Sequence, residues 1–338
     1  MSFPTERPRR LRKSALHREL AAEHRLHPAD FVAPLFVRED ILKPVPLTLL
    51  AGHNQETLDS ITDRVEALLS VGCTKILLFG IPAHKDATGS EAWNDGGIIQ
   101  EATRRIRSRF GHDVLIITDC CLDEYTSHGH CGILTEDGDV DNDATLVSYA
   151  KAAVSQARAG ADIIAPSGMM DGQVGAIREA LDEHGFSNVG IMAYSAKYAS
   201  CLYGPFREAA DCAPQFGDRS GYQMQPANGI EALREARLDA EEGADIIMVK
   251  PALWYLDIIS ALAHESELPV AAYLVSGECA MIHDGGERGL FNEERAMVEA
   301  HLALKRAGAT ILISYYAGAM CEYLAATTHA AHIPQAVH

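Results

Sequence analysis

The sequence lacks any hydrophobic run long enough to cross a membrane. Its apolar stretches fall short of the roughly 18–20 residues that a spanning helix needs. The N-terminus also lacks the apolar core of a signal peptide. We therefore expect a cytoplasmic protein without a membrane partner. The N-terminus is instead rich in arginine, which favours a solvated or partner-contacting arm over a transit peptide.

Positive charge is also scarce. Lys and Arg total 29 against 47 Asp and Glu, so the formal net charge is −18 at pH 7. A surface this acidic argues against nucleic acid or an anionic membrane as the main partner. Because no secretory signal is present, the eight cysteines are expected to be reduced thiols, metal ligands or core residues.

A linker rich in proline or serine is missing as well, so nothing divides the 338 residues into separate domains. One unit recurs four times, as LLSVGCTKILLFG, QARAGADIIAPSG, DAEEGADIIMVKP and LKRAGATILISYY. In each copy a helix is expected to end at a glycine (Gly72, Gly160, Gly243 or Gly308) before a short strand. Strands that are apolar on consecutive residues are typical of a parallel sheet covered on both faces.

Eight strands are expected in total. Four belong to the repeated unit, and the others lie at 31–37, 113–119, 188–197 and 268–277. Helical stretches separate them, and no dinucleotide-binding fingerprint follows the first strand. The pattern therefore predicts an α/β protein with a closed (β/α)8 TIM barrel rather than an open doubly wound sheet. Residues 1–30 carry no clear strand and are predicted to form an extended N-terminal arm outside a barrel of residues 31–338.

Two lysines follow buried strands directly. Functional groups of a barrel gather where its strands end, and Lys197 and Lys250 stand at the ends of the fifth and sixth strands. One such lysine could simply extend its amine to water. Two on adjacent strands favour another explanation, because burial and a neighbouring cation lower the pKa of an amine and free it to attack a carbonyl. We therefore hypothesise Schiff-base chemistry on a keto substrate.

The third strand runs into TDCCLDEYTSHGHCG, a segment rich in possible metal ligands. Cys121, Asp123 and Cys131 offer two sulfur ligands and one oxygen ligand, and would leave a fourth position open, as catalytic zinc sites do. The alternative is a set of free cysteines beside a loop. His128 and His130 could be ligands, donors to ligands, or surface residues.

Residues 200–226 form a long segment interrupted by glycine and proline. At a barrel mouth such a segment is typical of an active-site lid. Arg207 and Arg219 within it are suited to gripping a substrate carboxylate. Arginines on an exposed loop without a substrate would give the same pattern.

Several motifs, taken in order, resemble one family. YSAKYAS, MVKP, VSGE, YGPFREAA, APQFGDR and DxCxxEYTSHGHCG resemble porphobilinogen synthase, also called 5-aminolevulinate dehydratase, over nearly the whole chain. The resemblance implies a hydro-lyase that condenses two molecules of 5-aminolevulinate, with loss of two waters, to porphobilinogen in heme biosynthesis. It implies that Lys250 forms a Schiff base with the first molecule and that Lys197 engages the second. Asp119 would be a catalytic residue lining the second pocket.

The resemblance also implies the substrate contacts. Ser276 and Tyr315 would hold the carboxylate of the first molecule. Arg207, Arg219 and Gln223 would hold that of the second. The other substrate-binding residues that it implies are Ser167, Tyr203 and Phe206.

The metal loop departs from both branches of the family. One branch has three cysteines and uses zinc, and the other has Asp, Ala and Asp and does without that zinc. The set Cys121, Asp123 and Cys131 is a hybrid, for which zinc is expected and a magnesium-supported enzyme is the alternative. The motifs APSD and VSGEY of the family are APSG and VSGEC here, which places Gly168 and Cys279 near the site.

The resemblance implies two features outside the active site. Glu235 matches a carboxylate that holds an allosteric magnesium ion, although alone it would be a glutamate on a helix surface. The basic arm matches one that wraps a neighbouring subunit and builds a homo-octamer, where opposite charges could meet. A class I aldolase is an alternative function, but it would need neither the metal loop nor a second lysine. A barrel that only binds zinc or substrate is another, but it would need no amines with shifted pKa.

Overall fold

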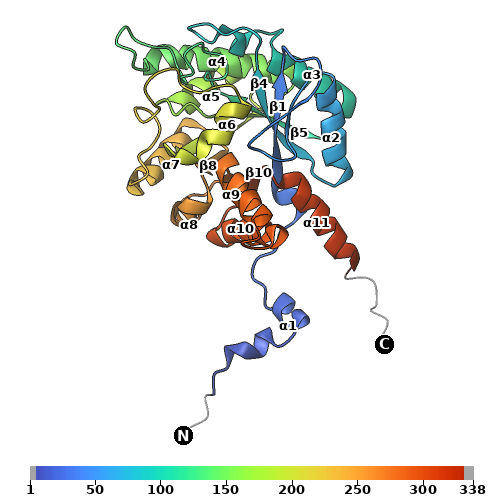
Figure 1. Cartoon of the computed structure of the whole chain (residues 1–338). Coiled ribbons are helices and arrows are strands. Elements are labelled where there is room, and N and C mark those ends of the chain that lie inside the picture. Colours follow the sequence, from blue (N-terminus) through green and yellow to red (C-terminus); the bar gives the residue numbers. More distant parts are fainter. Residues whose placement is uncertain (1–4, 331–338) are drawn as a thin grey trace.

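The computed structural model describes residues 5–330, so the ends of the predicted arm and barrel, at 1–4 and 331–338, lie outside it. Its centre is a barrel of parallel strands (Figure 1). Around the barrel these strands are β1 Phe31–Arg38, β4 Lys75–Ile81, β5 Leu115–Cys120, β6 Ile163–Pro166, β7 Gly190–Lys197, β8 Ile246–Lys250, β9 Val270–Leu274 and β10 Ile311–Ser314. Strand β10 pairs with β1 as well as with β9, which closes the barrel. The predicted (β/α)8 barrel is confirmed.

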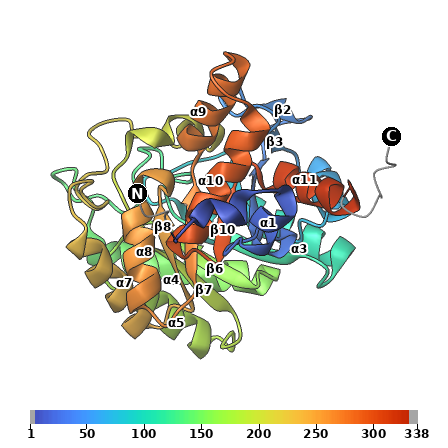
Figure 2. The same cartoon turned by 90° about the horizontal axis from the view of Figure 1, so that it is seen from below.

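Helices connect the strands and surround them, as the view from below shows (Figure 2). They are α2 Ser60–Ser70, α3 Ile98–Phe110, α4 Asn142–Ala159, α5 Gln173–Glu183, α6 Gly204–Ala209, α7 Ile230–Glu242, α8 Leu256–Glu265, α9 Ser276–Glu287, α10 Glu293–Ala307 and α11 Ala317–Ala330. A small hairpin of β2 Val45–Pro46 and β3 Asn54–Glu56, which the sequence did not predict, lies beside β1. Within residues 5–330, no helix combines the length and apolar character that a membrane crossing requires.

The repeated glycines lie at helix ends, as predicted. Gly72, Gly160, Gly243 and Gly308 have φ values of 83°, 108°, 106° and 115°. These left-handed values are accessible to glycine because it has no Cβ to clash with the backbone. Each glycine therefore turns the chain from a helix on the outside of the barrel into the strand that follows.

One strand end differs from the prediction in a way that concerns the site. The strand expected at 268–277 ends at Leu274, and Ser276 is the first residue of α9. The carboxylate of Glu278 accepts a hydrogen bond from the backbone N–H of Val275 at 2.7 Å. This arrangement is typical of the start of a helix, and it ends the strand before Ser276.

The chain up to helix α1 Ala15–Leu20 stands away from the barrel (Figure 1). It also contains the 3-10 turn η1 Pro8–Arg12, and neither of these two described elements buries a residue. Leu11, Leu16 and Leu20 are 54%, 75% and 81% exposed. The arm therefore presents a row of apolar side chains that its own barrel does not cover.

Candidate active site

Lys197 and Lys250 end neighbouring strands and lie opposite each other in register. Both are buried. Tyr194 precedes Lys197 by three residues, so a regular strand would place the two side chains on opposite faces. A bulge between Ala193 and Ala196 changes this alternation. As a result, the Nζ atoms of Lys197 and Lys250 lie 5.7 Å and 5.0 Å from the centre of the Tyr194 ring.

The amine of Lys250 is enclosed by aromatic rings. Its Nζ lies between 4.6 Å and 5.3 Å from the ring centres of Tyr273, Phe206, Tyr194 and Tyr203. Burial and the positive charge of Lys197 together lower the pKa of Lys250 to about 8, although nearby carboxylates oppose the shift. More of the amine is therefore uncharged near neutral pH than in an exposed lysine, and the uncharged amine is the form that attacks a carbonyl.

The expected lowering of the pKa does not apply to Lys197. Burial acts in that direction, but the negative charge of Cys131 and its neighbours outweighs it and raises the pKa of Lys197 above its usual value. The ammonium group donates a hydrogen bond to the backbone carbonyl of Ser167. Lys197 is therefore suited to binding a polarised oxygen or an anion rather than to attacking as a free amine.

Asp119 of β5 lies close to both amines. Its Oδ2 accepts a hydrogen bond from the hydroxyl of Ser167 at 3.1 Å, whereas its Oδ1 has no partner among the described residues. Burial raises the pKa of Asp119 to about 6, although the charges of Lys197 and Lys250 oppose the shift. A carboxyl group that titrates near neutral pH and keeps one oxygen free can take up or release a proton during a reaction.

Cys121, Asp123 and Cys131 lie together at the end of β5. Their ligand atoms are all within 4.8 Å of one another, and all three residues are buried. In the described part of the chain this is the only such group. Burial would raise the pKa of Asp123, but the guanidinium of Arg219, 2.7 Å from its Oδ2, lowers it below its usual range. Two thiols and an ionised carboxylate are a donor set that fits a divalent metal ion.

Tyr149 of α4 contacts this metal-ligand group. Its hydroxyl donates a hydrogen bond to the carbonyl of Cys131 at 2.8 Å and lies 3.4 Å from the sulfur of Cys121. A Cβ atom at Gly168 would overlap the hydroxyl and ring of Tyr149. Gly168, which departs from the family motif APSD, therefore leaves the space that Tyr149 occupies.

The first part of the segment predicted as a lid is held over Lys250 by hydrogen bonds. It consists of the 3-10 turn η4 Cys201–Tyr203 and helix α6. The hydroxyl of Tyr203 donates to the carbonyl of Lys250 at 3.2 Å, and the backbone N–H of Phe206 donates to the hydroxyl of Ser276 at 3.0 Å. These contacts place the lid against the ends of β8 and β9, where it covers the aromatic enclosure.

The two lid arginines differ in their surroundings. The guanidinium of Arg219 is buried and binds Asp123 together with the backbone carbonyls of Gly129 and Cys212. Arg207 is half-buried, and its Nε has no hydrogen-bond partner within the described chain. In this conformation Arg207 could bind a substrate carboxylate directly. At Arg219 the carboxylate would compete with Asp123.

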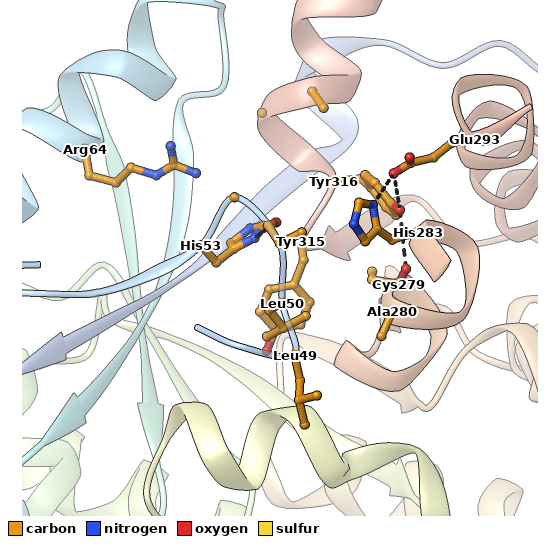
Figure 3. A pocket seen from close by; sticks show the side chains of 14 residues that line it. Leu49, Leu50, His53, Arg64, Cys279, Ala280, His283, Glu293, Tyr315 and Tyr316 are labelled. Carbon is orange, nitrogen blue, oxygen red and sulfur yellow. Dashed lines mark hydrogen bonds and ion pairs between the residues drawn. The ribbon is translucent and has the colours of Figure 1, made fainter. Parts of the chain in front are cut away.

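Tyr315 follows β10 and lies between the surroundings of Lys250 and a separate pocket. Its hydroxyl is hydrogen-bonded to that of Tyr273 at 3.1 Å, next to Lys250. Its ring also lines a separate pocket of about 290 Å³, which includes His53, Arg64 and Cys279 (Figure 3). Neither lysine lines this pocket. Cys279, the departure from VSGEY, therefore lies behind the tyrosine rather than among the catalytic candidates.

Gln223 and Glu235 line a larger cavity of about 870 Å³, together with Asp171 and Glu231. Burial raises the pKa of Glu235, and the charge of Asp171 adds to this effect. Neither lysine lines this cavity either. Glu235 thus lies apart from the lysines, in a group of carboxylates that includes Asp171 and Glu231.

Several groups that surround the predicted residues were not predicted from the sequence. Tyr194 and Glu124 lie within the motifs quoted above, so their position in these motifs could have marked them as candidates. Both carboxylate oxygens of Glu124 lack a partner among residues 5–330, and burial together with Asp123 raises its pKa well above the usual value. Tyr273 and Tyr149 carried no signal, because only the closed barrel brings them to the lysine and the cysteines.

The chain is similar over nearly its whole length to proteins of one family. The family model described as delta-aminolevulinic acid dehydratase matches residues 5–323. A delta-aminolevulinic acid dehydratase of Streptomyces coelicolor is 50% identical over 318 residues, which are 94% of this chain and 96% of that protein. The protein of that name from Bacillus subtilis is 48% identical over 96% of this chain and 100% of its own length. The crystal structure of delta-aminolevulinic acid dehydratase (porphobilinogen synthase) from Toxoplasma gondii, in complex with the reaction product porphobilinogen, has a TM-score of 0.94 and 38% identity, covering 99% of this chain and 96% of that one.

Proposed function

This chain belongs to the delta-aminolevulinic acid dehydratase family, and on that premise we propose that it condenses two molecules of 5-aminolevulinate to porphobilinogen with loss of two waters. It is a hydro-lyase of porphyrin biosynthesis. The observation that carries the proposal is the buried amine of Lys250, whose pKa is lowered to about 8 in an aromatic enclosure beside a second lysine. A reaction that joins two amino ketones needs an amine that attacks the carbonyl of one molecule and a second polar group that binds the other.

We assign the first substrate to Lys250. The uncharged amine would attack the ketone carbon, the carbonyl oxygen would leave as water, and a carbon–nitrogen double bond would remain. Ser276 and Tyr315 would hold the carboxylate at the other end of the molecule. The surrounding rings and the lid contact from Phe206 to Ser276 support this assignment, because they exclude the water that would hydrolyse the Schiff base.

The second substrate is assigned to the side of Lys197. Lys197 would bind its carbonyl oxygen as a cation, and Asp119 would move a proton with its free Oδ1, supported by Ser167. Arg207, Arg219 and Gln223 would hold its carboxylate. Because Arg219 is paired with Asp123, the incoming carboxylate would have to replace that pairing.

Cys121, Asp123 and Cys131 form the group that could hold a metal ion. We propose zinc there, because two thiolates favour it. A bound zinc ion would supply a Lewis acid close to Lys197. Glu235 is proposed to hold a separate allosteric magnesium ion, for which its half-buried carboxylate is suited.

The metal assignment can be tested by adding ions back to chelator-treated protein. Porphobilinogen formation would be followed with zinc alone, magnesium alone and both. Activity restored only when zinc is present supports the zinc site. Full activity with magnesium alone would contradict it and favour a magnesium-supported enzyme. No product under any condition would overturn the proposed function.

The lysine assignment can be tested by reduction with borohydride in the presence of 5-aminolevulinate. Lys250→Met should abolish both turnover and trapping of substrate on the protein. Lys151→Met serves as a control, because Lys151 is exposed on α4. Undiminished trapping in the Lys250 variant would refute the assignment.

We also propose a homo-octamer in the cytoplasm. The exposed leucines of the arm and the acidic character of the chain support docking of the basic arm on another copy. The eight cysteines are all free, which suits a reducing compartment. Light scattering should give a smaller particle when residues 1–30 are deleted, and an unchanged mass would contradict the role of the arm.

A further inference from the structure

Glu278, the third residue of α9, has a completely buried side chain with an unusual set of partners. One carboxylate oxygen, Oε1, accepts backbone hydrogen bonds from Leu253 at 2.6 Å and from Ala252 at 3.2 Å. The other, Oε2, accepts from the backbone N–H of Val275 at 2.7 Å. A carboxylate that only started the helix would need the last of these bonds alone.

The two sets of donors belong to the two ends of the site proposed for the first substrate. Ala252 and Leu253 follow Lys250 by two and three residues, and Val275 directly precedes Ser276. Glu278 therefore joins the segment that follows the attacking amine to the segment that holds the carboxylate-binding hydroxyl. The lid turn adds to this junction, since a Cβ at Gly277 would overlap the carbonyl of Leu202.

The chemistry of this contact explains why a carboxylate stands here. Burying a carboxylate without a cation is costly unless hydrogen bonds replace its water. No lysine or arginine of the described chain forms an ion pair with Glu278, and backbone N–H groups supply the replacement. A glutamine could not do so equally, because its amide nitrogen is a donor and would face either Val275 or Leu253.

We propose that Glu278 is a positioning residue that sets the spacing between the amine of Lys250 and the hydroxyl of Ser276. The pocket would thereby be matched to 4-oxo acids, in which two methylene groups separate the ketone from the carboxylate. This inference rests on the proposed Schiff base at Lys250. Glu278 itself touches neither substrate nor reacting atoms and acts through the two segments that it joins.

The test uses the full-length protein and three simple ketones trapped on it by borohydride. The probes are 4-oxopentanoate, 5-oxohexanoate, which is one methylene longer, and 2-pentanone, which has no carboxylate. Intact-mass spectrometry gives the trapping rate of each. The ratio of the rates for the two acids measures how well the spacing is set, and 2-pentanone reports on the amine alone.

We expect the wild-type protein to prefer 4-oxopentanoate. Glu278→Gln should reduce that preference by about tenfold or more, because a misplacement of about 1 Å can cost up to roughly a hundredfold. The rate with 2-pentanone should stay nearly unchanged. Glu278→Asp keeps the carboxyl group but is one methylene shorter, so it should lose part of the preference and retain more of it than the glutamine variant does.

Ser276→Ala is the matched control. It removes the hydroxyl whose spacing from the Lys250 amine Glu278 is proposed to set. It should therefore abolish the preference for 4-oxopentanoate. In the Ser276→Ala background, Glu278→Gln should cause no further loss of preference, because the hydroxyl that Glu278 is proposed to position is already absent.

Four outcomes separate the explanations. An unchanged preference in both Glu278 variants would overturn the inference, as would an equal loss for all three probes, which indicates general disruption. If the glutamine variant fails to fold, the aspartate variant decides on the same criteria. If the wild-type protein traps none of the ketones, the Schiff base of the proposed function fails instead.

Discussion

The ion pair between Asp123 and Arg219 makes a quantitative prediction, because Asp123 is both a candidate metal ligand and the partner of a buried cation. The two side chains are 3% and 4% exposed, and their charged atoms are 2.7 Å apart. Asp123→Asn keeps the shape of the side chain and removes its charge. Removal of one partner from a buried pair costs about 3–5 kcal/mol. Arg219 would keep its bonds to the carbonyls of Gly129 and Cys212, so we expect the lower end, about 3 kcal/mol.

The pH dependence of this loss has a definite sign. The folded protein holds the pKa of Asp123 below its value in the unfolded chain. The pair therefore contributes fully above the unfolded pKa of about 4, and its contribution is lost only as the pH falls below that value. The difference in stability between wild type and Asp123→Asn should be constant from about pH 5 to 8 and should shrink in stronger acid.

The measurement is denaturant unfolding of chelator-treated protein at one fixed concentration. Glu241→Gln is the control, because Glu241 and Arg237 form a pair whose side chains are both 60% exposed. Such a surface pair contributes no more than about 0.5 kcal/mol. A loss below about 1 kcal/mol for Asp123→Asn would refute the reasoning that the pair is buried and unscreened.

Four further predictions concern residues of the site. Tyr149→Phe removes the hydroxyl beside the cysteines and should weaken zinc binding by about 10- to 100-fold in a competition titration with a chelator; unchanged affinity would contradict the role of Tyr149. Gly168→Ala forces a methyl group against the Tyr149 hydroxyl and should lower the free energy of unfolding by about 1–3 kcal/mol, so an equally stable variant would count against the fit described. The rate of Schiff-base trapping should rise with pH and level off above about pH 8, since the pKa of Lys250 is lowered to about 8 and only the uncharged amine reacts. Lys197→Met should move that midpoint upward, because it removes a positive charge that lowers the pKa of Lys250, and a midpoint that does not move would show that the two amines are not coupled.

The barrel could be predicted from the sequence because it follows from local rules. Each of the four repeated units ends a helix at a glycine and begins a strand that is apolar on consecutive residues. Four further strands bring the total to eight, which implies a parallel barrel with helices outside. The same rule placed Lys197 and Lys250 together, since the ends of parallel strands meet at one edge. The predicted strand at 268–277 was too long, because the apolar pattern continues past Leu274, whereas the hydrogen bond from the backbone N–H of Val275 to Glu278 starts α9 there.

Several properties of the site were decided only by the tertiary structure. The bulge in β7 places Tyr194 and Lys197 toward the same space, although their separation of three residues predicts opposite faces. The raised pKa of Lys197 arises because burial is outweighed by the cysteines and carboxylate of a different strand end. The lowered pKa of Lys250 arises from burial and from its neighbour on the next strand.

By itself, the sequence determined the repeated units, the closed barrel and the residue types at the strand ends. These depend on neighbours in the chain and on the period of the apolar pattern. Only the tertiary structure decided that Arg219 pairs with Asp123, that Tyr149 uses the space left by Gly168, and that Glu278 joins the segments after Lys250 and before Ser276. Each of these contacts depends on packing between elements distant in the sequence, and no local pattern encodes which buried donor will meet which acceptor.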